Sequence, residues 1–249
     1  MQVSFHFFRI YQLFALFMFI TLTLSLPSMD YGQKVNSSPE RNHIALIEPG
    51  LNYTQHTEPH HRVTLPRLTQ FPDAAVMKLV NDDLSFEERQ LRIKASNCLS
   101  SAPHHSFWEQ KSRVSVLTHD VFSIESEAFV YCGGPHPDEQ YFPLTYNMQT
   151  GKRFDFARDA ATLFKSEILP ANDLIEIYKR HYPAEMSDCN ISFIDSNAGL
   201  ILNFAPRGLE ITLDLPHVIA ACGPEIVVPY REILPLVKND NPFRSLIKP

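Results

Sequence analysis

The sequence lacks the short motifs that mark common catalytic, nucleotide-binding and metal-binding sites. It contains no GxSxG nucleophile elbow, no HExxH zinc motif, no CxxC pair and no glycine-rich dinucleotide loop. The pair Gly151-Lys152 has neither the preceding glycine nor the following serine or threonine of a phosphate-binding loop. We therefore expect no cofactor, no bound metal and no recognisable set of catalytic residues, although missing motifs do not exclude an enzyme.

An excess of positive charge is also missing. The chain has 22 Lys and Arg residues against 28 Asp and Glu residues, which gives a formal net charge of -6. Loss of the N-terminal leader described below would remove Arg9 and change this charge from -6 to -7. Proteins that bind nucleic acids neutralise phosphates with clustered basic side chains, so this class is not expected. A mildly acidic surface would suit a basic partner.

One long apolar run is present, from Leu13 to Leu26, and it ends at Pro27. Arg9 precedes it and a polar segment follows it, which is typical of a secretory signal peptide. The run is shorter than the roughly 20 residues of a membrane-spanning helix. We expect residues 1–28 to be a signal peptide and the mature protein to be periplasmic or secreted. An extension back to Ile10 leaves an uncleaved anchor open, and only then is membrane contact expected.

The four cysteines, Cys98, Cys132, Cys189 and Cys222, all follow the leader. An even number of cysteines in an exported chain predicts two disulfides, and three pairings are possible. We favour Cys98 with Cys132 and Cys189 with Cys222, because each bond would close a loop of about thirty residues and stabilise the fold by roughly 3 to 4 kcal/mol. A zinc site made of the same residues is the alternative, but it lacks the usual CxxC spacing.

The remaining chain divides into a polar arm and a folded domain. Residues 29–61 are polar and proline-containing, with no sustained apolar period, and are predicted to be a disordered tether. The segment Val63-Thr64-Leu65 has strand character, so the folded domain is expected over residues 62–249.

Apolar spacing predicts a mixture of helices and hairpin-linked strands in this domain. Asp73 is a candidate N-cap, and Val76, Leu79, Val80 and Leu84 recur at helical spacing after it. This helix is expected to break near residue 85 and resume over residues 87–95. The other predicted elements are strands 113–118 and 121–131, a hairpin over 141–156, helices 160–169 and 172–182, strands 191–194, 200–204, 209–213 and 226–228, and a final helix 229–237. The pattern indicates an α+β fold: a mixed, mostly antiparallel sheet with helices packed on one face.

A stiff turn is predicted near the middle of the chain. Gly133 and Gly134 follow an apolar run that ends at Cys132, and both can adopt positive φ at no steric cost. The prolines on either side of His136 then restrict the backbone. His136 is therefore expected on a rigid loop, as a partner contact, as a general base or in a structural hydrogen bond. Tyr230 is expected either in the core with its hydroxyl satisfied or at a recognition surface.

Read in order, several short segments resemble the RsiV-like family. This family comprises the extracytoplasmic domain of a lysozyme-sensing anti-sigma factor and a domain found beside some peptidoglycan deacetylases. The matching segments are residues 63–68 with Val80-Asn81, 133–136, 146–152, Gly208-Leu209, 220–224 and 228–233. The resemblance covers most of residues 62–237.

The resemblance implies an exported, noncatalytic binding domain that recognises a cell-wall-related partner, either a lysozyme-type protein or a peptidoglycan-related ligand. The implied contact surface combines the loops around residues 133–137 and 223–230, with Gly133, Gly134, His136, Pro137, Pro229 and Tyr230 as binding residues. Two departures matter. Only nine residues precede the apolar run when it is extended back to Ile10, so no segment that holds a sigma factor is expected, and no deacetylase domain is expected either.

Two alternatives come from other classes of protein. The first is a hydrolase or carbohydrate-modifying enzyme of the cell envelope that uses His136 with a nearby carboxylate such as Asp138 or Glu139. The second is a purely structural envelope protein. An enzyme would require His136 and an acid to converge in a concave pocket, whereas a binding domain need not.

Overall fold

The computed structural model describes residues 45–102, 105–156, 170–186, 189, 199–215, 222–239 and 244. All of them belong to the second of two units into which the chain divides, His43–Pro249. The predicted signal peptide, the helix predicted at 160–169 and the strand predicted at 191–194 lie outside the described residues. In the part of the chain that is described, no helix is long and apolar enough to span a membrane.

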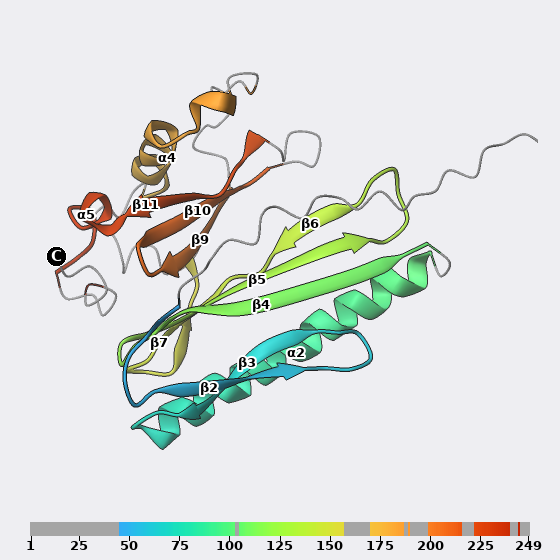
Figure 1. Ribbon diagram of the computed structural model, residues 1–249, viewed down its shortest axis with the longest axis horizontal. Coiled ribbons are helices and arrows are strands. Elements are labelled where there is room, and N and C mark those ends of the chain that lie inside the picture. Colours follow the sequence, from blue (N-terminus) through green and yellow to red (C-terminus); the bar gives the residue numbers. More distant parts are fainter. Residues whose placement is uncertain are drawn as a thin grey trace, which may run out of the picture. The chain divides into compact units, whose positions relative to one another are not determined.

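The elements follow one another as a series of strands interrupted by one long helix and a few short ones (Figure 1). In chain order they are β1 (Leu46–Ile47), β2 (Asn52–Thr57), β3 (Thr64–Gln70), α2 (Ala74–Ser101), β4 (Phe107–Leu117), β5 (Val121–Tyr131), β6 (Asp138–Tyr141), β7 (Leu144–Asn147), β8 (Lys152–Phe154), α4 (Pro170–Arg180), a 3₁₀ turn (Ala184–Met186), β9 (Gly199–Ala205), β10 (Gly208–Asp214), β11 (Ile226–Pro229) and α5 (Tyr230–Ile233).

The large sheet has six strands in the order β1-β4-β5-β7-β8, and β6 also pairs with β5. The pair β1 and β4 is parallel, whereas the other pairs are antiparallel. Strands β4 and β5 pair from Phe107 opposite Tyr131 to Leu117 opposite Phe122. The predicted α+β class with a mixed, mostly antiparallel sheet is therefore confirmed.

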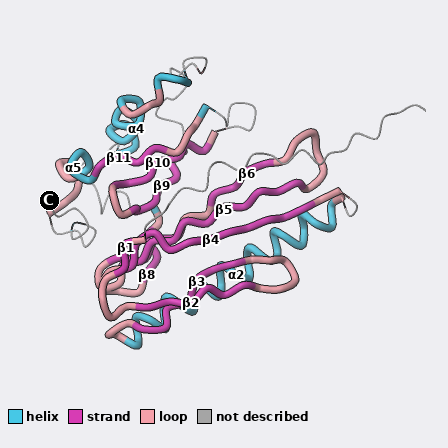
Figure 2. The backbone as a smooth tube through the Cα atoms, viewed as in Figure 1, coloured by secondary structure: helices cyan, strands magenta, loops and turns pink. Residues whose placement is uncertain are grey.

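Helix α2 covers one face of the large sheet and also contacts β3 (Figure 2). The carboxylate of Asp73 accepts hydrogen bonds from the backbone N–H groups of Ala75 and Val76, which confirms the predicted N-cap. The helix buries one stripe at spacings of three and four residues: Val76, Val80, Leu84, Glu88, Leu91, Ala95 and Cys98. All of them except Glu88, which pairs with Arg67 of β3, pack with Phe122, Ile124 and Tyr146 of the sheet in the first apolar core.

A second, three-stranded antiparallel sheet has the order β11-β10-β9. Its apolar residues form a separate core with residues of α4 and α5: Leu202, Phe204, Leu209, Ile211, Leu213, Val228, Leu174, Ile175, Ile177, Tyr178 and Ile233. Helix α4 contacts β11, and α5 contacts β10 and β11. Helix α2 thus packs on the large sheet, while the two shorter helices pack with the small sheet.

The two sheets meet through polar side chains. Adjacent residues of a strand face opposite sides, so Phe122 and Ile124 point to the α2 core whereas Ser123 points to β9. The Ser123 hydroxyl lies 2.5 Å from Oδ1 of Asn203, and Ser115 donates to the carbonyl of Phe204 at 2.6 Å. Asn203 in turn donates to Glu210 at 2.9 Å. These hydrogen bonds join β4 and β5 to the small sheet, together with Val116 and Val121, two buried residues of the large sheet that belong to the second apolar core.

Three sequence-based expectations are corrected. Part of the predicted tether is folded: β1 pairs with β4, and β2 pairs with β3 from Asn52 opposite Gln70 to Thr57 opposite Thr64. The predicted break near Ser85 is absent: the helix continues because buried residues lie on both sides of it, and the Ser85 hydroxyl donates to the carbonyl of Asn81 at 2.7 Å within the helix. Leu79, expected on the buried face, is 52% exposed.

Candidate functional site

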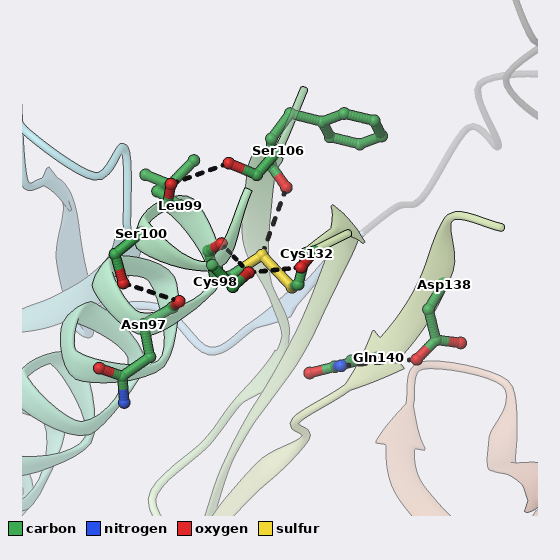
Figure 3. Close-up of a disulfide and its surroundings, with 10 residues drawn as sticks. Asn97, Cys98, Leu99, Ser100, Ser106, Cys132, Asp138 and Gln140 are labelled. Carbon is green, nitrogen blue, oxygen red and sulfur yellow. Dashed lines mark hydrogen bonds between the residues drawn. A yellow bond between two sulfur atoms is a disulfide. The ribbon is translucent and has the colours of Figure 1, made fainter. Parts of the chain in front are cut away.

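The loop of residues 133–137 joins β5 to β6, and all five of its residues are exposed. A disulfide between Cys98, in the last turns of α2, and Cys132 lies at its base (Figure 3). The hydroxyl of Ser101 donates to the carbonyls of both cysteines. On the other side, the hydroxyl of Tyr131 donates to the carbonyl of Gly134 at 2.7 Å. The loop is therefore exposed but tied to the helix and to β5.

The two glycines of this loop have different roles. Gly133 has a φ of +82°, and a Cβ atom there would lie 2.9 Å from Cβ of Ala102. Gly134 has no positive φ, and a Cβ atom would meet nothing within 4 Å. Both glycines were predicted to be free to adopt positive φ, but only Gly133 uses this freedom.

The face of the large sheet opposite α2 carries aromatic and acidic side chains beside this loop. We define this aromatic–acidic face by Phe107, Glu109, Glu127, Phe129, Tyr131 and Glu139. The rings of Phe107 and Phe129 lie 5.1 Å apart, and those of Phe107 and Tyr131 lie 6.1 Å apart. In the strand register, Phe129 has Glu109 of β4 on one side and Glu139 of β6 on the other. The three glutamates are exposed.

The sequence-based prediction missed this face. Its signal is the alternation within residues 121–131, where positions 122, 124, 128 and 130 are apolar and buried. The intervening positions lie on the opposite face: 123 is serine, 125 and 127 are glutamate, and 129 and 131 are aromatic. A strand with one face apolar except for Ser126, and the other face part acidic and part aromatic, predicts a partly exposed sheet surface.

A polar cleft lies where the small sheet meets β4 and β5. It contains about 360 Å³ of space, including its open side, and is lined by Arg113, Glu125, Ser126, Glu127, Tyr141, Pro143, Ile201, Asn203, Glu210, Thr212 and Glu225. Arg113 forms an ion pair with Glu125. Burial, and next the neighbouring charge of Glu125, raise the pKa of Glu210 to about 8.

Pro229 and Tyr230 do not share a surface with the 133–137 loop. The Tyr230 hydroxyl donates to the carbonyl of Ala205 at 2.6 Å, and its ring stacks on Phe204 with centroids 6.4 Å apart. Burial raises the pKa of this hydroxyl. The backbone N–H of Phe204 donates to the hydroxyl of Ser123, which lies eight residues before Tyr131 on β5. At about 3.3 Å per residue this is roughly 26 Å along the strand, so Tyr230 lies far from the loop that follows Tyr131. Tyr230 therefore adopts the first of its two expected roles, that of a core aromatic.

Both favoured cysteine pairings are confirmed, since Cys189 and Cys222 form the second disulfide and no cysteine is free. The alternative zinc site is wrong, because the four sulfur atoms form two disulfides and leave no thiolate to bind zinc. Over the described ranges, no group of three or more His, Cys, Asp or Glu residues could hold a metal ion. The adjacent residues His60 and His61 donate backbone hydrogen bonds to the carboxylate of Glu58.

Comparisons with known proteins found similarity to solved structures but to no family model and no curated protein. Among solved structures, the chain resembles a member of the DUF3298 family from Bacteroides fragilis, with a TM-score of 0.49 and 12% identity over 80% of this chain and 96% of that one. It also resembles a DUF3298 family protein from Pseudomonas aeruginosa, with a TM-score of 0.49 and 15% identity over 76% and 93% of the two chains. Since both TM-scores lie below 0.5, the site is assigned from the residues of this chain alone.

Proposed function

We propose that this chain is an exported, noncatalytic binding domain that recognises a basic protein through the 133–137 loop and the aromatic–acidic face. The observation that carries the proposal is the fixed, exposed loop beside a solvent-accessible sheet face. The Cys98–Cys132 disulfide and the Tyr131 hydrogen bond hold the loop before any partner arrives. A surface that is already ordered loses less conformational entropy on binding, so more of the contact energy appears as affinity.

The chemistry of the face favours a basic partner with an apolar contact patch. Aromatic side chains are enriched in the buried centres of protein interfaces, and Phe107, Phe129 and Tyr131 form such a group here. The exposed carboxylates around them attract positive charge and would accelerate association with a basic protein. Together with the sequence resemblance, this supports a lysozyme-type muramidase as the partner. A peptidoglycan-related ligand is the alternative occupant.

The enzyme alternative receives less support from the geometry. A catalytic His136 would have to converge with a carboxylate in a concave pocket. His136 and Glu139 are both exposed, and neither lines the polar cleft. The two disulfides agree with an exported protein, because such bonds persist in oxidising compartments.

The proposal is tested by titrating a lysozyme into the disulfide-intact domain and measuring heat. We expect Phe129→Ala to weaken binding about tenfold or more, the range of a central aromatic contact. Phe86→Ala is the matched control, since Phe86 is 46% exposed on α2, on the other side of the sheet. The Phe86→Ala variant should bind lysozyme with the same affinity as the native domain.

Two results would overturn the proposal as stated. The first is the absence of heat from the native domain at high micromolar lysozyme, with a parallel titration of soluble peptidoglycan fragments to test the alternative occupant. The second is an equal loss of affinity in the Phe129 and Phe86 variants, since this would place the contact elsewhere or reflect a general loss of folding.

A further inference from the structure

We propose that the outer face of α2 pairs antiparallel with the same face of a second copy of this chain, with Phe86 of both copies at the two-fold axis. This inference goes beyond the proposed function and does not depend on it. The aromatic–acidic face lies on the other side of the large sheet, so a pair formed through α2 leaves that face accessible in both copies.

The first observation is an exposed apolar stripe on α2. Leu79, Phe86 and Ile93 are 52%, 46% and 54% exposed, and they follow one another at intervals of seven residues. At about 100° per residue, the three side chains lie within roughly 40° of arc, and Phe86 is about 200° from buried Leu84. The stripe therefore faces away from the α2 core. Exposed apolar side chains that recur every seven residues on a long helix are typical of a seam between two helices.

The spacing of this stripe is symmetric about Phe86. Leu79 lies seven residues before it and Ile93 lies seven residues after it. When a second α2 lies antiparallel with the two Phe86 residues level, Leu79 of each copy is level with Ile93 of the other. The three apolar positions then form three layers, about 10.5 Å apart at 1.5 Å per residue. The surface is therefore complementary to itself, as a two-fold interface requires.

The second observation is the placement of charge beside the stripe. Asp82 lies four residues before Phe86 and Arg89 lies three residues after it, and both are exposed. In the antiparallel pair, Arg89 is level with position 83 of the second copy, one residue from Asp82 and on the same side of the seam. The two-fold axis makes two such ion pairs. A parallel pair would instead place Arg89 level with Arg89 and Asp82 level with Asp82, and this repulsion disfavours it.

The other charges along α2 follow the same division. Residues 78–87 carry one basic and three acidic side chains, Lys78, Asp82, Asp83 and Glu87, whereas residues 89–94 carry three basic ones, Arg89, Arg92 and Lys94. Glu88 between them is buried and paired with Arg67. The ion pair of Lys78 with Asp82 is itself exposed, with 74% and 61% of the two side chains accessible, so Asp82 can exchange this partner for another. The acidic half of one helix thus lies beside the basic half of the other.

The dimensions of the helix fit a weak pair. Helix α2 has 28 residues, about 42 Å at 1.5 Å per residue, and the three layers occupy its central half. A seven-residue repeat drifts by about 20° per repeat on an α-helix, which favours a left-handed crossing near 20°. Three apolar layers and two exposed ion pairs make a small interface, so we expect a dissociation constant on the order of 100 µM.

The test is sedimentation equilibrium of the disulfide-intact protein from about 5 µM to about 1 mM, where the native protein should follow a monomer–dimer equilibrium. Phe86→Glu places two like charges at the two-fold axis and should weaken dimerisation about tenfold or more. Leu46→Glu is the matched control, because Leu46 is 40% exposed on β1, outside the stripe. The control should dimerise as the native protein does. Circular dichroism checks that each variant is folded.

A charge exchange tests the antiparallel orientation at low ionic strength. Arg89→Glu should weaken dimerisation about threefold to tenfold, because each new glutamate meets Asp82 of the other copy. Addition of Asp82→Lys restores opposite charges across the seam, so the double variant should dimerise within about twofold of the native protein. In a parallel pair, Arg89→Glu would replace one like-charged contact by another, and the second substitution would recover nothing.

A native protein that stays monomeric up to about 1 mM would overturn the proposal. Unchanged dimerisation in folded Phe86→Glu would also overturn it, and so would an equal loss in Leu46→Glu, because the contact would then lie elsewhere. If Phe86→Glu does not fold, Ile93→Glu in the same stripe decides in the same way. A double variant that dimerises no better than Arg89→Glu alone would contradict the antiparallel arrangement.

Discussion

The hydroxyl of Tyr146, on β7, donates a 2.9 Å hydrogen bond to a carboxylate oxygen of Asp83 on α2. The Tyr146 residue is fully buried, and its ring stacks on Phe122 with centroids 6.1 Å apart. Asp83 also lies 3.8 Å from the guanidinium of Arg153 on β8. Arg153 also pairs with Glu87 of α2, so polar contacts of Tyr146 and Arg153 fix the helix and the sheet against each other beside the apolar core.

Replacing Tyr146 by Phe should destabilise the domain by about 1 to 2 kcal/mol, since the ring is kept while a hydrogen bond to a charged group is lost. Urea unfolding measures the change. Tyr141→Phe is the control, because the Tyr141 hydroxyl bonds to exposed Glu139 at 3.1 Å and its loss should cost less than about 0.5 kcal/mol. Equal effects of the two substitutions would contradict the structural role of the Asp83 contact.

Gly208→Ala should destabilise the small sheet severely, by about 3 kcal/mol or more. Gly208 pairs with Pro229 across β10 and β11, and a Cβ atom there would lie 2.0 Å from the carbonyl oxygen of Val228. Gly134→Ala is the matched control because its Cβ atom would be in open space. Thermal unfolding followed by circular dichroism should show a lower midpoint for the first variant alone.

Removal of the Cys98–Cys132 disulfide by alanine substitution should cost about 4 kcal/mol, from the loop entropy of a 34-residue separation. Removal of Cys189–Cys222, with a separation of 33, should cost about the same in the same entropy model. Guanidinium unfolding measures both changes. Only the first substitution should also weaken binding of the protein partner, because that bond anchors the 133–137 loop.

Thiol labelling of the denatured, unreduced protein provides a separate check on this chemistry. No cysteine is free in the structure, so no thiol should react before a reductant is added. Labelling of two or more cysteines would show that at least one of the two bonds does not form in the exported protein.

The stability that Glu210 contributes should decrease with rising pH. Burial and then the Glu125 charge raise its pKa from 4.5 to about 8, so between these values unfolding releases a proton. The contribution is fully present below about pH 4.5 and is lost as pH rises through 8, with a slope of at most about 1.4 kcal/mol per pH unit. Unfolding free energies of the native protein and Glu210→Gln at pH 5 and pH 8 measure it. The native protein should lose stability relative to Glu210→Gln between pH 5 and pH 8, and a gain in its relative stability would contradict the prediction.

The elements that the sequence predicted well are those with strong local signals. Residues 121–131 form β5 as predicted, because period-two alternation specifies a half-buried strand, and Asp73 caps α2 because its side chain satisfies free N–H groups. The cysteine pairing followed from loop lengths. The helix break near Ser85 was wrongly predicted because serine has low helix propensity, whereas burial of the residues around it decided the outcome.

The predictions that failed depend on contacts distant in sequence. Strand β2 is polar and mostly exposed, so its sequence has the composition of a tether, and pairing with β3 makes it a strand. The segment before residue 113 joins β4 because it pairs with β5 as far as Phe107. The placement of Tyr230 on the candidate surface was wrong for the same reason, since nothing local to Tyr230 indicates that its hydroxyl reaches the carbonyl of Ala205. The polar cleft likewise forms only where β5 and β10 meet.

The polar contact between the sheets, through Ser115, Ser123 and Asn203, has a consequence for how the domain comes apart. It lies between two apolar cores: the first contains α2, and the second contains α4 and α5 with only Val116 and Val121 from the large sheet. Water can replace the partners of these hydrogen bonds far more readily than it can replace packed side chains. The small sheet with α4 and α5 should thus detach as a cooperative unit before the α2 core opens, and backbone amides of β9 and β10 should exchange with solvent sooner than those of β5. The single contact unit that holds all the described residues would then have two levels of stability, with the cleft at the boundary between them.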